Sequence, residues 1–433
     1  MNKHSDSKKT DIQKQDKWQL ISQGFNNKTN FATRGIGLYK NELYIGTQSY
    51  NKKRKNQLKT LVKLIGTGNT LPFRFAVKSD GCEVWKYNFE TKKLTQLIGN
   101  KEEADLPAGF GNKSNLSAAA IKEFKGKLYI GTANSPTIGC EVWRYDGEKW
   151  EQVMSKGFGD PNNYGAWTFQ IFKDYLYVGT TNWNNTKKGY CQIWRTKDGE
   201  KWEKVVDRGF RDFDDNEKTR NRYVWSMIEF KNSLYAGTYN PHRIFSHKGC
   251  QLWKTNDGET WEKVLLPNGD GFGKGANYGI RDMEIYNGWL YLGTAVMNPF
   301  FGFQIWKYNG EKWVLVTKNK EIEFTHKANG FNKTFFSSRY HKYAWSIVRT
   351  SNNKLYLGCL NGRDGSIMYR FDENKWVEIV GENGEKPPSF GSKSNMGVRS
   401  IIEYPKGSNN IFIGTSTSFI SPKTCQLWLR KNQ

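Results

Sequence analysis

The sequence predicts an all-β protein, a seven-bladed β-propeller of four-stranded antiparallel blades, on three observations. The pattern Leu-Tyr-x-Gly-Thr, or a near variant, returns along the whole chain. Its seven copies begin at Leu43, Leu128, Leu176, Leu234, Leu290, Leu355 and Ile411. Each copy lies among further short runs with strand character, and the run missing from the last copy stands at the start of the chain. Such self-similarity indicates a repeat architecture, and four antiparallel strands per repeat are typical of a propeller blade.

The strands of one repeat are clearest in the second copy. They cover residues 118–124, 128–132, 140–145 and 150–154. Apolar and polar residues partly alternate within these runs, as they do in strands with one buried face. Short connections join them, and the glycine of Lys125-Gly126-Lys127 permits the positive φ of a tight turn. We therefore expect each repeat to fold as a four-stranded meander.

The two ends of the chain predict how the ring closes. The last repeat reaches its third strand at Cys425-Gln426-Leu427-Trp428 and has no room for a fourth. Residues 17–25 match residues 149–158, which contain the fourth strand of the second repeat. We expect a strand around Trp18 to complete the last blade, because this pairing hides the edges that an open sheet leaves exposed.

The repeat also predicts the domain organisation of the 433 residues. Residues 1–16 are polar throughout, and we expect them to be a disordered tail. Residues 17–433 are expected to form a single propeller domain. Within it, residues 48–80 are a basic insertion in the first blade.

The chain is basic, with 66 Lys and Arg against 42 Asp and Glu and a formal net charge of +24. This balance is compatible with polyanions, including nucleic acid, bound through the basic surface. A nucleic-acid site is not favoured, because no recognised nucleic-acid motif accompanies the charge and many lysines fall in turns. No apolar run is long enough to span a membrane, and the sequence leaves the oligomeric state open.

The cysteines follow the repeat. Five of the six hold the same place in five repeats: Cys82, Cys140, Cys191, Cys250 and Cys425. Equivalent positions of separate blades lie too far apart for a disulfide or a shared metal. We expect buried free thiols, which indicate a reducing compartment. Because residues 1–16 also lack the apolar core of a secretory signal, a cytoplasmic protein is predicted.

Twelve of the 17 tryptophans form two columns of the repeat. The third strands contain Trp85, Trp143, Trp194, Trp253, Trp306 and Trp428, and the fourth strands open near Trp18, Trp150, Trp202, Trp261, Trp313 and Trp376. A large ring at the same depth of every blade predicts packing between adjacent sheets rather than carbohydrate binding.

Two hairpins carry a family resemblance. The segments Thr196-Lys197-Asp198-Gly199-Glu200-Lys201-Trp202 and Thr255-Asn256-Asp257-Gly258-Glu259-Thr260-Trp261 resemble the Asp-box turn of sialidase-type and lectin-type propellers, with a turn one residue shorter. The resemblance implies a propeller fold of the repeat-rich kind. Asp-box turns are structural in that family, so the resemblance assigns no catalytic residue.

The candidate ligand-binding site is one column near the start of the first strands, expected at the mouth of the central channel on the loop-rich face. In repeat order its members are Arg34, Ala119, Trp167, Trp225, Arg281, Trp345 and Arg399. Arginine offers forked donors for carboxylate, phosphate or sulfate, and tryptophan offers a flat face for a sugar or a base. Asp282 follows Arg281 and is expected to orient it. The alternative is that these arginines and tryptophans stack on one another between blades and bind no ligand.

We interpret the chain as a non-enzymatic recognition propeller for an anionic or carbohydrate ligand or a partner protein. Two alternatives stay open: a hydrolase or lyase of sialidase-like type that acts on an acidic glycan, and a protein-interaction scaffold that uses the loops and the insertion. No Tyr nucleophile or acid catalyst can be assigned, so no catalytic residue is predicted. His242, His247 and His341 are expected in loops, where histidines are more often exposed than ligating, so no metal or cofactor is predicted either.

Overall fold

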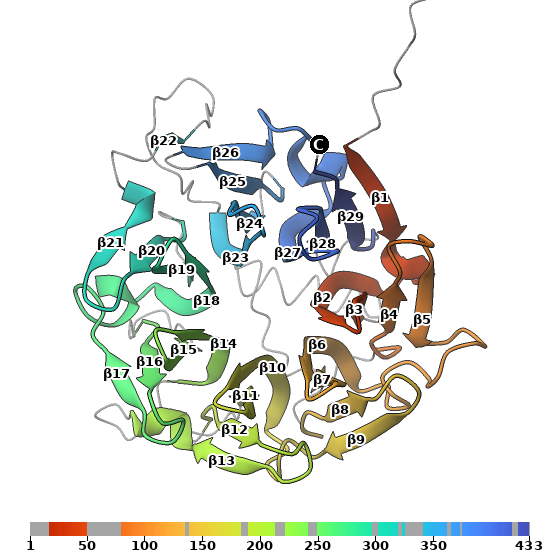
Figure 1. Cartoon of the computed structure of the whole chain (residues 1–433), viewed down its shortest axis with the longest axis horizontal. Coiled ribbons are helices and arrows are strands. Elements are labelled where there is room, and N and C mark those ends of the chain that lie inside the picture. The colour runs from red at the N-terminus through yellow and green to blue at the C-terminus, as the bar shows by residue number, and fades with distance from the viewer. Residues whose placement is uncertain are drawn as a thin grey trace, which may run out of the picture.

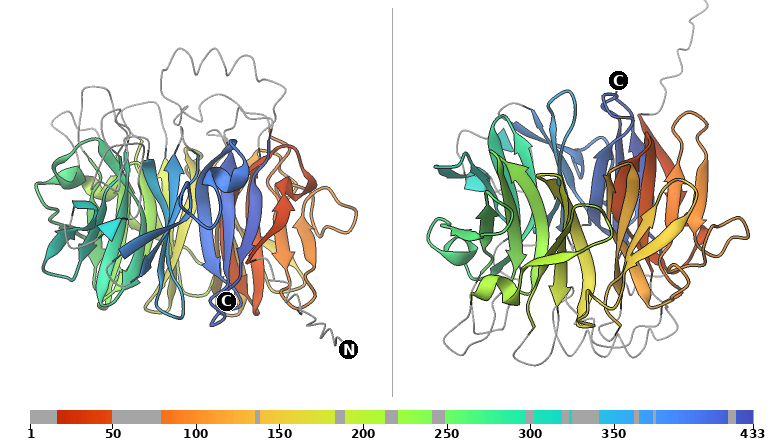
Figure 2. Two further views of the ribbon diagram at one scale, coloured as in Figure 1. Left: turned by 90° about the horizontal axis from the view of Figure 1, so that it is seen from above. Right: turned by 60° about the horizontal axis from the view of Figure 1, so that its bottom comes forward.

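The computed structural model of the chain describes residues 17–49, 79–134, 138–182, 189–212, 221–240, 249–296, 302–318, 323–324, 341–361, 365–372, 375–417 and 423–432. They form an all-β ring in which radial sheets surround a central opening (Figure 1). The strands run between the two faces of the ring, as the side views in Figure 2 show.

Each sheet pairs its strands in chain order, as the first one illustrates. β2 (Asn30–Tyr39) pairs with β3 (Glu42–Ser49), β3 with β4 (Val84–Tyr87), and β4 with β5 (Leu94–Ile98), all antiparallel. We call each sheet a blade and name it after its innermost strand, so that this sheet is the β2 blade. The other innermost strands are β6 (Asn115–Phe124), β10 (Asn163–Phe172), β14 (Tyr223–Phe230), β18 (Asn277–Tyr286), β23 (His341–Arg349) and β27 (Asn395–Glu403).

The remaining strands occupy equivalent places outside the innermost ones. The second strands are β7 (Lys127–Asn134), β11 (Tyr175–Asn182), β15 (Ser233–Tyr239), β19 (Trp289–Val296), β24 (Leu355–Asn361) and β28 (Ile411–Thr417). The third are β8 (Val142–Tyr145), β12 (Ile193–Thr196), β16 (Leu252–Thr255), β20 (Ile305–Tyr308), β25 (Met368–Asp372) and β29 (Gln426–Arg430). The outermost are β9 (Trp150–Met154), β13 (Glu203–Val206), β17 (Glu262–Val264), β21 (Trp313–Leu315) and β26 (Lys375–Val380), which β22 (Glu323–Phe324) joins in parallel. This arrangement is a β-propeller, and its strands fit about seven blades.

Short 3₁₀ helices connect several blades. They are η1 (Gly24–Asn26), η3 (Arg208–Arg211), η4 (Asp270–Gly273) and η6 (Pro388–Gly391), with η5 (Val316–Lys318) directly after β21. Each of the four connecting helices contains a phenylalanine that packs against a tryptophan of a neighbouring blade: Phe25, Phe210, Phe272 and Phe390 contact Trp85, Trp253, Trp306 and Trp428.

The ring closes through its first strand. β1 (Trp18–Gln23) pairs antiparallel with β29, and Trp18 lies opposite Arg430. Glu385 locks the pair: it accepts hydrogen bonds from Lys17 Nζ (3.0 Å), Trp18 Nε1 (3.0 Å) and Arg430 Nη2 (2.6 Å). The predicted pairing of the segment around Trp18 with the last repeat is therefore confirmed.

The hydrophobic core lies between adjacent blades. One cluster joins Phe230 and Leu252 of the β14 blade with Ile280, Leu290 and Trp306 of the β18 blade. Both tryptophan columns pack into such clusters, as predicted from the repeat. Burying these rings at each interface holds the blades together, because their apolar area is large.

A phenylalanine between consecutive blades completes each aromatic set. Phe272 stacks on Trp306 with ring centroids 4.7 Å apart and an interplanar angle of 11°, and it meets Trp313 edge-on at 5.5 Å. The same stacking recurs for Phe110, Phe158, Phe210 and Phe390 on Trp143, Trp194, Trp253 and Trp428.

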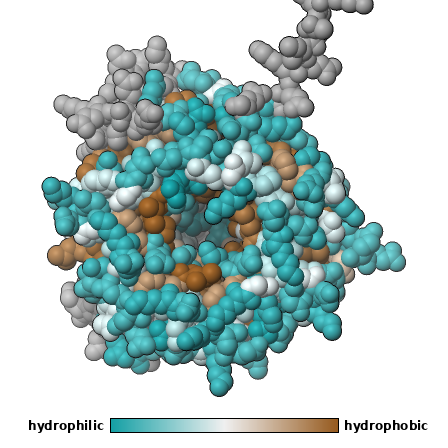
Figure 3. Space-filling view, in the orientation of Figure 1, coloured by the Kyte–Doolittle hydropathy of each residue, from teal (hydrophilic) through white to brown (hydrophobic). Residues whose placement is uncertain are grey.

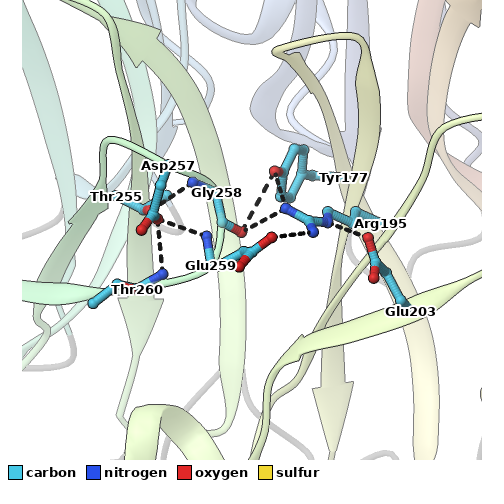
Figure 4. Close-up of polar contacts among 8 residues, drawn as sticks. All are labelled: Tyr177, Arg195, Glu203, Thr255, Asp257, Gly258, Glu259 and Thr260. Atoms are coloured by element: carbon cyan, nitrogen blue, oxygen red, sulfur yellow. Dashed lines mark hydrogen bonds and ion pairs between the residues drawn. The ribbon is translucent and has the colours of Figure 1, made fainter.

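The Asp-Gly hairpins link one blade to the previous one (Figure 4). In the turn between β16 and β17, Asp257 Oδ1 accepts hydrogen bonds from the Thr255 hydroxyl and from the two backbone amides after Gly258, each at 2.8 Å. The Gly258 carbonyl then accepts from Arg195 Nη1 at 3.3 Å and from the Tyr177 hydroxyl at 3.5 Å. Hydrogen bonds within the turn thus stabilise its conformation, and hydrogen bonds from Arg195 and Tyr177 attach it to the β10 blade.

Two further predictions can be compared with the structure. All six cysteines are buried and none forms a disulfide, as expected. Burial raises the pKa of five of these thiols: Cys82, Cys140, Cys191, Cys250 and Cys359. The start predicted for the basic insertion is wrong by two residues, because Gln48 and Ser49 belong to β3. Ser79 and Asp80 belong to the described segment that leads into β4. Residues 50–78 and the predicted tail, 1–16, lie outside the described residues.

Candidate functional site

A cavity of about 220 Å³ lies on the ring axis. The space-filling view shows the ring hollowed at its centre (Figure 3). Every residue of the predicted column contributes to its wall: Arg34, Ala119, Trp167, Trp225, Arg281, Trp345 and Arg399. Asp282 and Ser400 line it as well. The structure therefore brings together side chains that are widely separated along the chain.

The column owes its position to a β-bulge in every innermost strand. The register against the second strand shifts between Ala166 and Thr168, so that Trp167 is left unpaired. The same shift occurs around Arg34, Ala119, Trp225, Arg281, Trp345 and Arg399. A bulge bends the strand and re-aims the extra side chain. The column lies midway along its strands, inside the ring, rather than at the channel mouth as expected.

Each arginine of the column lies over a tryptophan from another blade. The guanidinium carbon is 4.0 Å from the indole centroid for Arg34 and Trp167, 5.2 Å for Arg281 and Trp225, and 4.2 Å for Arg399 and Trp345. These distances are within the range of cation–π attraction. The stacking expected under the alternative interpretation thus occurs, while all six side chains still border the cavity.

Glycines make room for two of these indoles. A Cβ on Gly279 would lie 2.1 Å from the Trp225 ring, and a Cβ on Gly397 would lie 2.2 Å from the Trp345 ring. Each glycine stands two residues before the arginine that covers the same indole. Gly279 and Arg281 both belong to β18, and Gly397 and Arg399 both belong to β27, so one strand contacts each indole twice.

Among the described residues, none of Arg34, Arg281 and Arg399 forms an ion pair. The Nε atoms of Arg34 and Arg399 are buried without a hydrogen-bond partner, and so are Trp167 Nε1 and Ser400 Oγ. Burial lowers the pKa of Arg399 to about 9 and also lowers the pKa of Arg281. The Asp282 charge acts on Arg281, whereas no carboxylate in the described part of the chain forms an ion pair with Arg34 or Arg399.

Asp282 does not orient Arg281 through a hydrogen bond. One of its oxygens accepts from the Ile347 amide of β23 at 2.8 Å, and the other accepts from the Met283 amide at 3.0 Å. Burial raises the pKa of Asp282 to about 6. Glu284, two residues on, accepts from the Arg349 amide at 3.2 Å, and burial raises its pKa to about 7. The two carboxyl groups thus link β18 to β23.

A layer of tyrosines, which the sequence analysis did not identify, packs against the same tryptophans. The hydroxyls of Tyr164 and Tyr223 are hydrogen-bonded to each other, and Tyr278 donates to Tyr343. Burial raises the pKa of all four phenols, so they remain neutral. These residues lie two or three positions before the column, where tyrosine recurs in four repeats.

The predicted histidine loop is only partly described. His341 is the first residue of β23 and not a loop residue; it is buried and its ring lies 6.1 Å from that of Phe303. His242 and His247 lie outside the described residues. In the described part of the chain, no group of three His, Cys, Asp or Glu residues is placed to hold a metal ion.

These features define the class: a β-propeller with an arginine- and tryptophan-lined cavity on its axis. No family model matches the chain, and no curated protein matches its sequence. Within the described residues, no helix is long and apolar enough to cross a membrane.

Many solved structures match in fold. One is a polysaccharide lyase, an ulvanlyase bound to -[GlcA(1-4)Rha3S]-, with 10% identity, coverage of 93% of this chain and 95% of that chain, and a TM-score of 0.50. The β-propeller domain of the Trilobed protease from Pyrococcus furiosus has 9% identity, coverage of 93% and 96%, and a TM-score of 0.46. At these identities the similarity shows the fold alone.

Proposed function

We propose that this protein is a non-enzymatic recognition propeller that binds a small anionic ligand, such as an acidic sugar, in its axial cavity. The observation that carries the proposal is the set of three arginines, Arg34, Arg281 and Arg399, which line one cavity without an ion-pair partner among the described residues. The three arginines are half-buried. A partly desolvated cation without a counter-charge costs free energy, and an anionic ligand would supply that charge.

The side chains that line the cavity and the volume of the cavity limit which kinds of ligand can bind. Arginine donors bind carboxylate, sulfate or phosphate, and the indole edges offer apolar contact to a sugar ring. The volume of about 220 Å³ lies below the range of roughly 300–1,000 Å³ that suits drug-sized ligands. A single sugar acid is therefore favoured over a long oligosaccharide.

Calorimetric titration with D-glucuronate at pH 7 and low salt tests the proposal, with methyl glucoside as the neutral comparison. The triple variant Arg34→Gln, Arg281→Gln, Arg399→Gln should lose at least about 100-fold in affinity. A control variant removes the same charge from exposed loops through Lys156→Gln, Arg208→Gln and Arg211→Gln, and should bind as the parent does. Equal binding by parent and cavity variant would contradict the proposal.

Turnover assays separate recognition from catalysis. We expect acidic oligosaccharides incubated with the protein to remain intact, with no new reducing ends and no unsaturated products. Cleavage that the cavity variant lacks would assign the cavity to an enzyme. Loss of a captured partner protein on deletion of residues 50–78, with cavity variants unaffected, would favour an interaction scaffold.

The number of blades, the bounds of the domain and the cellular location are also part of the proposal. We propose seven blades in a single domain, residues 17–433, supported by seven copies of the repeat and by the pairing of β1 with β29. The six buried free cysteines support a cytoplasmic location. Complete reactivity of all six thiols with a maleimide after denaturation of the protein purified from its native cell would test the absence of disulfides.

A further inference from the structure

The residue that follows each member of the column also lines the cavity, and one of these residues is a carboxylic acid. In repeat order they are Gly35, Ala120, Thr168, Ser226, Asp282, Ser346 and Ser400. Asp282 is the one Asp or Glu among the described residues that line the cavity. The β18 blade therefore places a titratable group where every other blade has a small neutral residue.

The Asp282 carboxyl group is fixed to the cavity wall. Its oxygens accept hydrogen bonds from the Ile347 amide at 2.8 Å and from the Met283 amide at 3.0 Å. These donors belong to the backbone of β23 and β18, so the carboxyl group is held in place. The side chain is half-buried. Because the cavity measures only about 220 Å³, a ligand inside it lies close to every residue of the wall, including Asp282.

The protonation of Asp282 depends on burial and on one neighbouring charge. Burial opposes ionisation, while the positive charge of Arg281 favours it, and the resulting pKa is about 6. Glu284 lies two residues further along β18, and burial raises its pKa to about 7. Glu284 is not among the described residues that line the cavity.

The strands packed against β18 contribute few other charges. The charge of Arg349 on β23 acts on Glu284, and Glu229 on β14 is exposed. Burial raises the pKa of the tyrosines on these and adjoining strands, which therefore stay neutral: Tyr223, Tyr239, Tyr278, Tyr291 and Tyr343. In the described part of the chain, Arg281 is the one charged side chain that acts on Asp282.

The ionisation of Asp282 changes the charge that a ligand meets. When Asp282 is neutral, the cavity wall carries the charges of the three arginines; when it is ionised, a negative charge opposes them. Two negative charges in one small, partly desolvated cavity repel each other, so an anion binds more weakly beside an ionised Asp282. By thermodynamic reciprocity, a bound anion favours the protonated form of Asp282.

We infer that Asp282 couples ligand binding to protonation: the cavity takes up its anionic ligand together with a proton on Asp282 and releases the ligand when that proton leaves. The proton comes from solvent, adds to a carboxylate oxygen and returns to solvent on release. This inference rests on the proposed function and specifies how binding at that site is regulated. Capture is thus favoured at mildly acidic pH and release at neutral pH and above.

Calorimetric titration with D-glucuronate between pH 5 and 7.5 tests the inference. The ligand stays a monoanion in this range, because free carboxyl groups titrate at about 4. Arg399, with a pKa of about 9, stays protonated. The affinity of the parent should fall about 5- to 10-fold from pH 5 to 7.5. Asp282→Asn should bind at pH 7.5 about as tightly as the parent does at pH 5.

The proton itself can be counted. Titrations in buffers of different ionisation enthalpy measure the protons taken up with each ligand. We expect about half a proton at pH 6.5 for the parent and none for Asp282→Asn, since a tenfold change in affinity corresponds to a pKa shift of about one unit on Asp282. The affinity profile and the proton uptake of the parent test the inference even if Asp282→Asn does not fold.

Glu284→Gln is the matched control. Glu284 lies on the same strand and accepts a hydrogen bond from the Arg349 amide at 3.2 Å, as Asp282 does from the Ile347 amide. Because Glu284 does not line the cavity in the described structure, this variant should keep the pH profile of binding that the parent shows. A change in the pH dependence of stability alone is expected for it.

The outcomes separate the two claims. If the parent binds D-glucuronate with the same affinity from pH 5 to 7.5 and takes up no proton, the inference is wrong and the proposed function stands. The inference is also wrong if Glu284→Gln removes the pH dependence and Asp282→Asn does not, or if Asp282→Asn binds more weakly than the parent at every pH. If the parent does not bind D-glucuronate anywhere in this range, both claims fail.

Discussion

The indole of Trp225 rests on the backbone of Gly279, one blade further along the chain: a Cβ at Gly279 would lie 2.1 Å from that ring. Arg281, on the same strand as Gly279, places its guanidinium 5.2 Å from the Trp225 centroid. This part of the site is therefore built from two neighbouring blades, and its geometry depends on how tightly they pack.

Gly279→Ala tests this packing. The new methyl group cannot fit beside the Trp225 ring, so the variant should lose about 2 kcal/mol of unfolding free energy and shift the tryptophan fluorescence. Urea unfolding measures the loss. Gly165→Ala is the matched control, because its Cβ would approach the Trp167 ring only to 3.1 Å. Equal losses in both variants would mean that the contact with Trp225 is not decisive.

Gly258→Ala tests the hairpin that links two blades. Gly258 has φ +89°, and a Cβ there would lie 2.1 Å from the Tyr177 hydroxyl. Gly288 also has a positive φ, +75°, but open space around it, so Gly288→Ala reports backbone strain alone. We expect the Gly258 variant to be less stable than the Gly288 variant by about 1–2 kcal/mol in urea unfolding. Similar stabilities would show that the hairpin contributes little to the interface.

Glu385 should make ring closure sensitive to acid. Although burial opposes ionisation, hydrogen bonds from Arg430 and Lys17 lower the pKa of Glu385 from 4.5 to about 2. A depressed carboxyl pKa contributes stability above its unfolded value, and this contribution is lost as pH falls from about 4.5 to 2.

Glu385→Gln should lack that pH-dependent component and cost about 2–3 kcal/mol at pH 7, because Arg430 is then buried without a carboxylate. Lys17→Ala, whose ion pair is partly exposed, should cost less than about 1 kcal/mol. Thermal unfolding followed by circular dichroism between pH 2 and 7 measures both. A parent and a Glu385→Gln variant with parallel pH profiles would contradict this role.

Asp282 and Glu284 should affect the pH dependence of stability in the opposite direction from Glu385. Burial raises their pKa values to about 6 and about 7, so their ionisation disfavours the folded state. The stability they provide is complete below their unfolded values near 4 and is lost as pH rises through 6 and 7.

The double variant Asp282→Asn, Glu284→Gln should therefore gain about 1–3 kcal/mol over the parent between pH 4 and 7.5 in urea unfolding. Its amide oxygens can still accept from the Ile347 and Arg349 amides. Asp174→Asn with Glu229→Gln, both exposed, provides the control with equal charge change. A difference between parent and double variant that does not change with pH would refute the assignment.

The repeat alone was sufficient to predict the propeller, its closing strand and the membership of the cavity. Strand periodicity places Trp18 opposite the last repeat, and alignment of the repeats brings Arg34, Arg281 and Arg399 into one column. This works because equivalent positions of a repeat occupy equivalent positions in space.

The features that alignment of the repeats could not predict depend on local geometry. A bulge adds one residue without disturbing the period of two on either side, so nothing in the sequence marks Trp167 as unpaired. Arg34 reaches Trp167 because Ala119, on the blade between them, has a short side chain; the residue types show this only once the blade order is known. His341 was misplaced because its repeat begins with His where most others begin with Asn, which conceals the start of β23.

The closure of the ring has a consequence for biosynthesis. β1 is translated before every other strand of the ring, yet its partner β29 is translated after all of them. Intermediate blades can assemble on neighbours already made, whereas the opening segment must wait with an unpaired edge, since contacts of such long sequence separation form late. Residues around Trp18 are thus expected to need protection by a chaperone until β29 has been translated.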